Sequence, residues 1–166
     1  MDPATFQGSF TNLGRTRARG LELAVEASPR AALRLTAQYT LLDGEVLESG
    51  DAFDTPVYAA GRPLLRRPRH QGALGGRWRG GPVLLGADLI LVGDRADSDF
   101  AGLGLEENSG YARLDARARV ALGGGLEALV VGENLLDRRY QDVLGYPALG
   151  RSLRVGLRYR RGTDNR

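Results

Sequence analysis

The connections between the apolar segments of this chain alternate between two very different lengths. Short turns rich in Gly and Pro fall at residues 28–30, 80–82 and 123–125. Long polar connections run roughly over residues 43–68, 94–110 and 137–150. A meander with tight turns at one end and long loops at the other is how a transmembrane β-barrel is built. The pattern predicts an all-β fold, an antiparallel meander of about seven or eight long strands that forms a segment of such a barrel.

The segments themselves alternate between apolar and polar residues. In residues 31–42 the side chains from Leu33 to Leu41 are apolar or aromatic at every second position, and those from Arg34 to Thr40 between them are polar. A period of two is typical of a β-strand. The segments are about 10 to 14 residues long, close to the roughly 9 to 11 that a tilted membrane strand needs and longer than an ordinary strand of about 5 to 6. Length therefore favours strands that cross a bilayer.

The same alternation recurs in residues 69–79, 111–122 and 151–161, and it is less regular in two other segments. In residues 16–27, Arg17 and Arg19 share a face with the leucines. An Arg at the middle of a bilayer costs about 2–4 kcal/mol, so we expect both to lie at the loop end of the strand. In residues 126–133 Glu127 and Glu133 share a phase with Leu129 and Val131, so both faces are partly apolar. Residues 4–10 are a possible eighth strand.

Composition argues against enzymatic and metal chemistry. The chain has no Cys and one His, His70, which lies at the start of a strand, where an interfacial or lumenal position is more natural than a general base. The glycines at 123–125 lack the Lys-Ser/Thr of a phosphate loop. We expect no catalytic residues, no metal centre and no cofactor. The net charge of +3 comes from Arg alone, spread along strands rather than clustered, so no nucleic-acid partner is expected.

The chain also lacks recognisable targeting segments. Its first residues carry no basic start, apolar core or cleavage site of a secretory signal. No run of about 18 apolar residues predicts a transmembrane helix. A barrel strand needs no such run, because only every second residue faces lipid.

The long connections are acidic. Carboxylates at alternate loop positions suit calcium, but no EF-hand spacing is present, and solvated loop charge is the simpler interpretation. If these loops capture a ligand, the candidate positions are Asp51, Asp54, Tyr58, Asp97, Asp99 and Tyr146.

The C-terminal segments resemble a known family. Residues 133–140 read Glu-Asn-Leu-Leu-Asp-Arg-Arg-Tyr, and Gly145-Tyr146-Pro147 and then Gly150-Arg151 follow before the last strand. This order is similar to the last hairpin of TonB-dependent outer-membrane receptors, with most likeness to the vitamin B12 receptor branch. Earlier motifs of that family match in order at residues 12–15, 20–22, 39–43 and 67–70. The residues that carry the final motif are Asn134, Leu135, Asp137, Tyr140, Gly150 and Arg151.

The resemblance implies a barrel of about 22 strands around an N-terminal plug, in the outer membrane of a Gram-negative cell. It implies import of a scarce large ligand, such as a siderophore, cobalamin or another metal chelate, driven by TonB through the plug. Outer-membrane lipid and lipopolysaccharide would surround the wall. We expect residues 1–166 to form the C-terminal portion of one barrel domain, with the plug, the earlier strands and a signal sequence lying upstream. The family usually ends on an aromatic residue, where this sequence has Arg161 and a polar tail.

Two other architectures fit the alternation. One is a self-contained eight-stranded outer-membrane barrel with a structural or adhesive role, in which residues 4–10 supply the eighth strand. Its narrow interior would have to pair many arginines with acidic groups. The other is a soluble lipocalin-like ligand-binding barrel, which would place the aliphatic rows inside.

Overall fold

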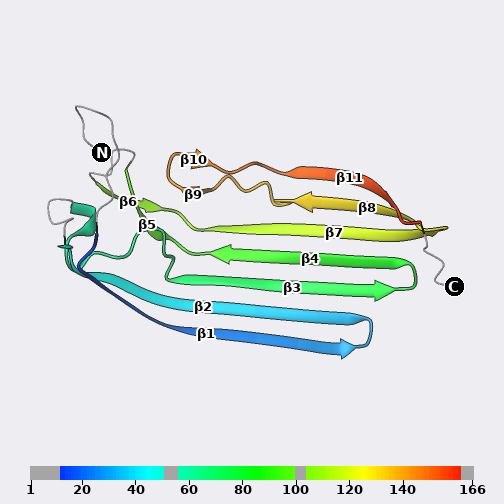
Figure 1. The fold of residues 1–166 in the computed structure, drawn as a ribbon, viewed down its shortest axis with the longest axis horizontal. Coiled ribbons are helices and arrows are strands. Elements are labelled where there is room, and N and C mark those ends of the chain that lie inside the picture. The colour runs from blue at the N-terminus through cyan, green and yellow to red at the C-terminus, as the bar shows by residue number, and fades with distance from the viewer. Residues whose placement is uncertain (1–11, 51–55, 100–103, 162–166) are drawn as a thin grey trace.

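The computed structural model describes residues 12–50, 56–99 and 104–161. Seven long strands form one antiparallel sheet (Figure 1). In sheet order they are β1 (Arg15–Arg30), β2 (Leu33–Glu48), β3 (His70–Gly80), β4 (Val83–Val92), β7 (Tyr111–Gly123), β8 (Leu126–Glu133) and β11 (Ser152–Tyr159). The predicted all-β meander is confirmed. The predicted strand at residues 4–10 lies outside the described residues.

The three long connections leave the sheet at one end and the short turns lie at the other (Figure 1). We call the long ones loop A (residues 49–69), loop B (93–110) and loop C (134–151). Loop A holds the 3-10 helix η2 (Pro56–Tyr58). Loop B holds the hairpin of β5 (Arg95–Ser98) and β6 (Leu105–Asn108), and loop C holds β9 (Gln141–Val143) and β10 (Tyr146–Pro147). No helix in the described part of the chain is long and apolar enough to cross a membrane.

The first predicted turn is wrong. Residues 28–30 belong to β1, and the chain reverses at residues 31–32 instead. Pro29 is tolerated because β1 is an edge strand of the described sheet, where a missing N–H can face away from the ladder. The pairing with β2 is irregular between Ala27 and Arg30, which absorbs the proline. The other two turns fall where the sequence predicts, and Gly81 and Gly124 adopt the positive φ that such tight turns require.

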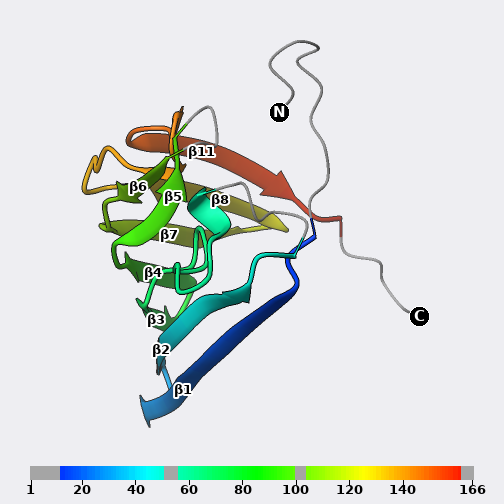
Figure 2. The same cartoon turned by 90° about the vertical axis from the view of Figure 1, so that its left-hand side faces the viewer.

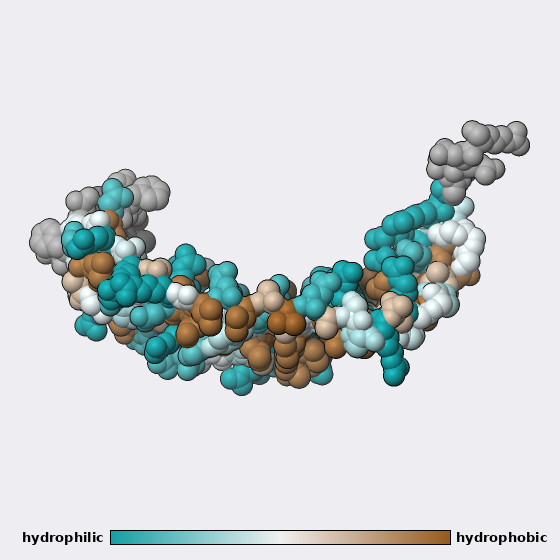
Figure 3. Space-filling view, turned by 90° about the horizontal axis from the view of Figure 1, so that it is seen from below, coloured by the Kyte–Doolittle hydropathy of each residue, from teal (hydrophilic) through white to brown (hydrophobic). Residues whose placement is uncertain are grey.

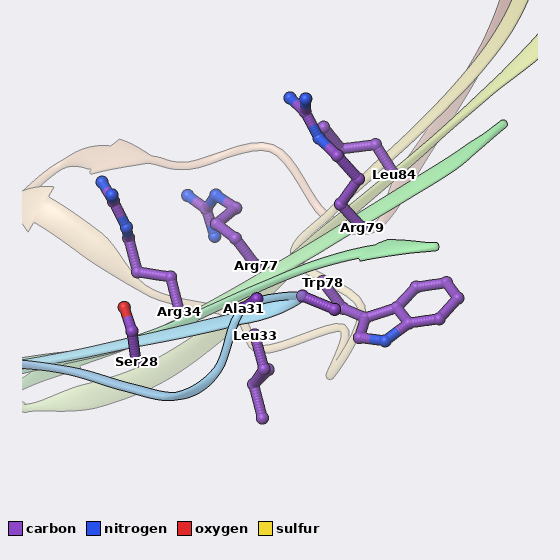
Figure 4. A pocket seen from close by; sticks show the side chains of 9 residues that line it. Ser28, Ala31, Leu33, Arg34, Arg77, Trp78, Arg79 and Leu84 are labelled. Atoms are coloured by element: carbon purple, nitrogen blue, oxygen red, sulfur yellow. The ribbon is translucent and has the colours of Figure 1, made fainter. Parts of the chain in front are cut away.

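Register sorts the side chains into apolar and polar rows. Leu74 lies between Ala37 and Leu89, and Leu89 in turn pairs with Leu114. Three residues along, in the polar row, Arg117 on β7 pairs with Gly86 on β4. Figure 4 shows the two faces at the turn end, where Arg34, Arg77 and Arg79 point to one side and Leu33 and Trp78 to the other.

The apolar rows do not converge on a compact core. Leu153, Val155 and Leu157 are 68%, 73% and 72% exposed, and the only buried apolar side chains among the described residues are Val46 and Val57 in the loop region. Figure 3 shows the molecule bowed, with hydrophobic residues gathered along the middle of its convex side and hydrophilic ones at both ends. This arrangement argues against the lipocalin-like alternative, because exposed aliphatic rows of this extent need an apolar solvent.

The strand pairing also explains the two segments whose alternation is irregular. Arg17 and Arg19 pair with Glu45 and Asp43, beyond the point where β3 begins opposite Leu41, so they lie at the loop end as predicted. On β8, Leu129 and Val131 pair with arginines on β7, so the polar face is partly apolar there. Seen along the strands from the loop end, the sheet is an open arc with β1 and β11 as its edges (Figure 2).

Candidate ligand-binding end

The predicted family motif in loop C is held by hydrogen bonds of its own side chains. Asn134 is buried and adopts a positive φ of 50°. Its amide donates to the carbonyls of Arg138 (2.9 Å) and Leu149 (3.1 Å), and its carbonyl accepts from the Arg138 amide at 3.0 Å. One side chain therefore fixes both the start and the end of loop C, in a left-handed conformation that Asn tolerates well.

The other motif residues close the same loop. Asp137 Oδ1 accepts the backbone N–H of Arg151 at 2.9 Å, and the Leu135 amide donates to the Leu114 carbonyl at 2.8 Å. A Cβ at Gly150 would lie 3.2 Å from that Asp137 oxygen, a tight contact beside this hydrogen bond. The motif thus has a structural reason in this chain: it ties the two ends of loop C together and anchors the loop onto β7.

Asn134→Ala is expected to destabilise the folded chain by about 1–3 kcal/mol, because it leaves buried backbone groups without partners. The measurement is the urea concentration at which the folded form is lost in detergent. Leu136→Ala, at an exposed neighbouring position, is the control and should move that midpoint little. Equal effects of both substitutions would contradict the anchoring role of Asn134.

An aromatic and cationic cluster lies beneath loop C on the polar face. Tyr140 stacks on Tyr111 with ring centroids 3.9 Å apart, and Arg113 Nη1 donates to the Tyr140 hydroxyl at 3.1 Å. The Tyr111 hydroxyl donates to Asp142 at 2.8 Å, and Arg113 also pairs with Asp115 at 3.1 Å. These contacts fix loop C against β7.

Two hollows open beside this cluster. One, of about 270 Å³, is lined by Arg113, Glu133 and Tyr140 among others. The second, of about 570 Å³, is lined by Asp137, Arg139 and Tyr140. Because Tyr140 and Gly150 line both, the two hollows adjoin. Their walls offer one Arg each, acidic side chains and the shared Tyr140 ring to a ligand that enters from the loop end.

The three long loops meet at one buried carboxylate, Asp97 in β5. Its side chain is fully buried. Oδ1 accepts from Arg66 Nε of loop A at 2.9 Å and from the Ser98 amide at 2.8 Å, and Oδ2 accepts from the Leu144 amide of loop C at 2.9 Å. Arg66 also donates its backbone N–H to the carbonyl of Ala96. We call this arrangement the loop junction.

The hydrogen bonds of the loop junction favour the ionised form of Asp97. Burial by itself raises the pKa of this carboxyl, but the hydrogen bonds from the Leu144 amide, Arg66 and the Ser98 amide outweigh it and hold the pKa below the ordinary value. A lowered pKa means that this stabilisation is present above the ordinary aspartate pKa and is lost only as the pH falls through the lowered one. The junction is therefore intact at neutral pH.

A second set of contacts ties loop B to loop C. The Arg95 side chain is only 4% exposed and donates to the carbonyls of Gln141 and Asp142. Asn108, opposite Arg95 on β6, donates to the same Gln141 carbonyl at 3.1 Å. Arg95 also lies 5.8 Å from the centroid of the Tyr111 ring. Loop B is thus bound to β9 from both strands of its hairpin.

The described candidates for ligand binding lie in all three long loops, and their role in binding stays a prediction. Tyr58 lies at the end of η2, and Tyr146 is exposed on β10. The Asp99 amide donates to the Gly104 carbonyl within loop B, and Asp97 is enclosed by the loop junction. Asp51 and Asp54 lie outside the described residues. Sequence reasoning missed Arg66, Arg95 and Arg113, although Arg66 begins a basic run, Arg66-Arg67-Pro68-Arg69, within a loop rich in acids.

The polar face carries a ladder of ion pairs. Asp88 accepts from Arg77 at 2.9 Å and from Arg117 at 2.7 Å, and Glu133 pairs with Arg154 at 2.7 Å. At the turn end, a hollow of about 480 Å³ lies among the arginines of Figure 4. Within the described residues, no group of three or more His, Cys, Asp or Glu is arranged to hold a metal ion.

An open antiparallel sheet, apolar on its convex face and charged on the other, with interlocked loops at one end, is the wall of a transmembrane β-barrel. A family model described as "TonB dependent receptor-like, beta-barrel" matches residues 2–135. The chain belongs to this family, which comprises transport receptors. The resemblance identified from the sequence motifs is confirmed.

Individual relatives agree. Over 145 residues, 84% of this chain, the sequence is 30% identical to the ferric-pyoverdine M114 receptor PbuA of Pseudomonas sp. (strain M114), of which it covers 17%. The fold is similar to that of the siderophore receptor PiuA from Acinetobacter baumannii, with a TM-score of 0.71, 20% identity, and coverage of 87% of this chain and 22% of that one. It is also similar to the ferripyoverdine receptor of the outer membrane of Pseudomonas aeruginosa, with a TM-score of 0.66, 18% identity, and coverage of 87% and 19%. The chain thus spans about a fifth of the length of these relatives.

Proposed function

We propose that residues 1–166 form the C-terminal portion of the barrel domain of an outer-membrane receptor, and that their loop end contributes to the capture of an iron chelate. The single observation that carries this proposal is the sequence relationship to a ferric-pyoverdine receptor over most of the chain. The hollows under loop C support it, because each combines an Arg, acidic side chains and the shared Tyr140 on the polar side of the wall.

The ligand class proposed here is a siderophore rather than cobalamin. The relatives reported above are receptors for iron chelates, and the likeness of loop C to the vitamin B12 receptor branch stays a prediction. Import would further require a plug and TonB, and lipid or lipopolysaccharide would cover the apolar rows. The fragment therefore acts as part of a wall, with gating supplied elsewhere in the receptor.

Arg139 offers a test of ligand capture. We define the PbuA chimera as the ferric-pyoverdine receptor PbuA in which this chain replaces the strands that it matches. Arg139→Glu reverses an exposed charge that lines the larger hollow, so we expect it to weaken retention of ⁵⁵Fe-labelled ferric pyoverdine by about tenfold or more, the range of an interface hot spot.

Arg138→Glu is the matched control. Arg138 is an equally exposed neighbour that lies outside the lining of that hollow and contacts Asn134 through its backbone alone. We expect its retention of ferric pyoverdine to match that of the unmodified chimera. If both substitutions weaken ferric-pyoverdine retention equally, the effect comes from the overall charge of the loop and not from the hollow. Absence of binding by an unmodified, folded chimera would overturn the proposed capture of ferric pyoverdine.

A further inference from the structure

The position of Asp97 has a consequence beyond stability. A carboxylate in loop B that binds loop A through one oxygen and loop C through the other makes the position of each outer loop depend on the middle one. The carboxylate itself is completely buried, so water does not reach its oxygens, whereas the Arg66 side chain that binds it is half exposed.

The neighbouring contacts make this dependence asymmetric. Loop C is bound to loop B at three points, namely Asp97, Arg95 and Asn108. Among the described residues, the hydrogen bonds given between loop A and loop B come from Arg66, by its side chain to Asp97 and by its backbone to Ala96. Loss of the Asp97 carboxylate should therefore loosen loop A, leaving the backbone bond from Arg66 to Ala96, while β5–β6 stays attached to β9.

We propose that Asp97 is a positioning residue that holds loops A, B and C as one body over the hollows under loop C. The inference rests on the proposed function, because the loops are held in position to bind the captured chelate. Asp97 touches no ligand itself. It fixes Leu144, and through it the part of loop C that carries Tyr140 and Tyr146.

Distance measurements on the full chain test the junction directly. The sequence contains no Cys, so spin labels can be placed at Ala60→Cys in loop A and Leu149→Cys in loop C, both exposed. The labelled chain is diluted with unlabelled chain in detergent, so that only distances within one molecule contribute. We expect one narrow distance distribution, and a broad one when Asp97→Asn is added, because the amide presents a donor where the carboxylate accepted from Leu144 or Arg66.

Glu106→Gln is the control. Glu106 pairs with Asp97 across the β5–β6 hairpin but is exposed, so the substitution makes the same change of charge outside the junction. It should leave the distribution narrow. A distribution that is equally broad with and without Asp97→Asn would overturn the inference, as would one that Asp97→Asn leaves narrow.

The PbuA chimera separates this inference from the proposed function. We expect Asp97→Asn to weaken ferric-pyoverdine retention at least tenfold and Glu106→Gln to leave it unchanged. A broadened distribution with undiminished retention would overturn the positioning role. A chimera that binds nothing, while Asp97→Asn still broadens the distribution in the full chain, would reject the proposed function and leave the junction standing.

Discussion

Leu89→Arg is expected to destabilise the membrane-embedded wall by about 2–4 kcal/mol, whereas Ile90→Arg at the next residue should cost at most about 1 kcal/mol. Both residues are aliphatic and lie in β4, but they face opposite sides of the sheet. Leu89 pairs with Leu74 and Leu114 in the apolar row. An Arg there would lie near the middle of the span, where lipid gives its charge no hydrogen bonds.

Ile90 is the matched control because it lies in the charged row. It pairs with Arg113 on β7 and lies two residues from the carboxylate of Asp88. An added Arg at this position remains in water and near acidic groups. The measurement is the urea midpoint of the PbuA chimera in phospholipid vesicles. If Ile90→Arg lowers the urea midpoint more than Leu89→Arg does, the face that carries Ile90 is the one in lipid. The assignment of the aliphatic rows to lipid would then be wrong.

This contrast between adjacent residues is also what made the fold predictable from sequence. The alternation in residues 31–42 and 111–122 is a local property, since each side chain takes the face that its position in the strand dictates. The long loops and short turns then specify which end is which. The error at Pro29 has a physical reason: proline usually ends a strand, but an edge strand can accommodate it.

The loop end was less predictable because its contacts join residues far apart in sequence. Asp97 meets Arg66 and Leu144 only after three separate loops are brought together by the sheet. β2 continues to Glu48, well beyond the apolar segment, because β1 pairs with it as far as Glu48 and residues 61–64 of loop A bind Val46 and Gly44. Neither feature has a periodic signature. The sequence motif identified Asn134 and Asp137. Their structural role, which is to hold loop C in place, is visible only in their hydrogen bonds.

The two open edges of the sheet determine how the chain should behave by itself. β1 and β11 each pair with one neighbour in the described sheet, so the outer edge of each carries unpaired N–H and C=O groups. In a bilayer each such group costs several kcal/mol. Refolded alone into phospholipid vesicles, the 166-residue chain is therefore expected to associate edge to edge into SDS-sensitive oligomers.

The PbuA chimera supplies the strands that both edges lack, and it should give a monomeric species whose gel mobility changes on heating. Crosslinking in vesicles and gel mobility with and without heating distinguish the two behaviours. A monomeric, protease-protected species formed by the chain alone would show that the edges close on each other, with residues 4–10 available as an eighth strand. Closure would then favour the small-barrel alternative, in which the same arginine rows would have to be neutralised within a narrow interior instead of facing a wide aqueous lumen.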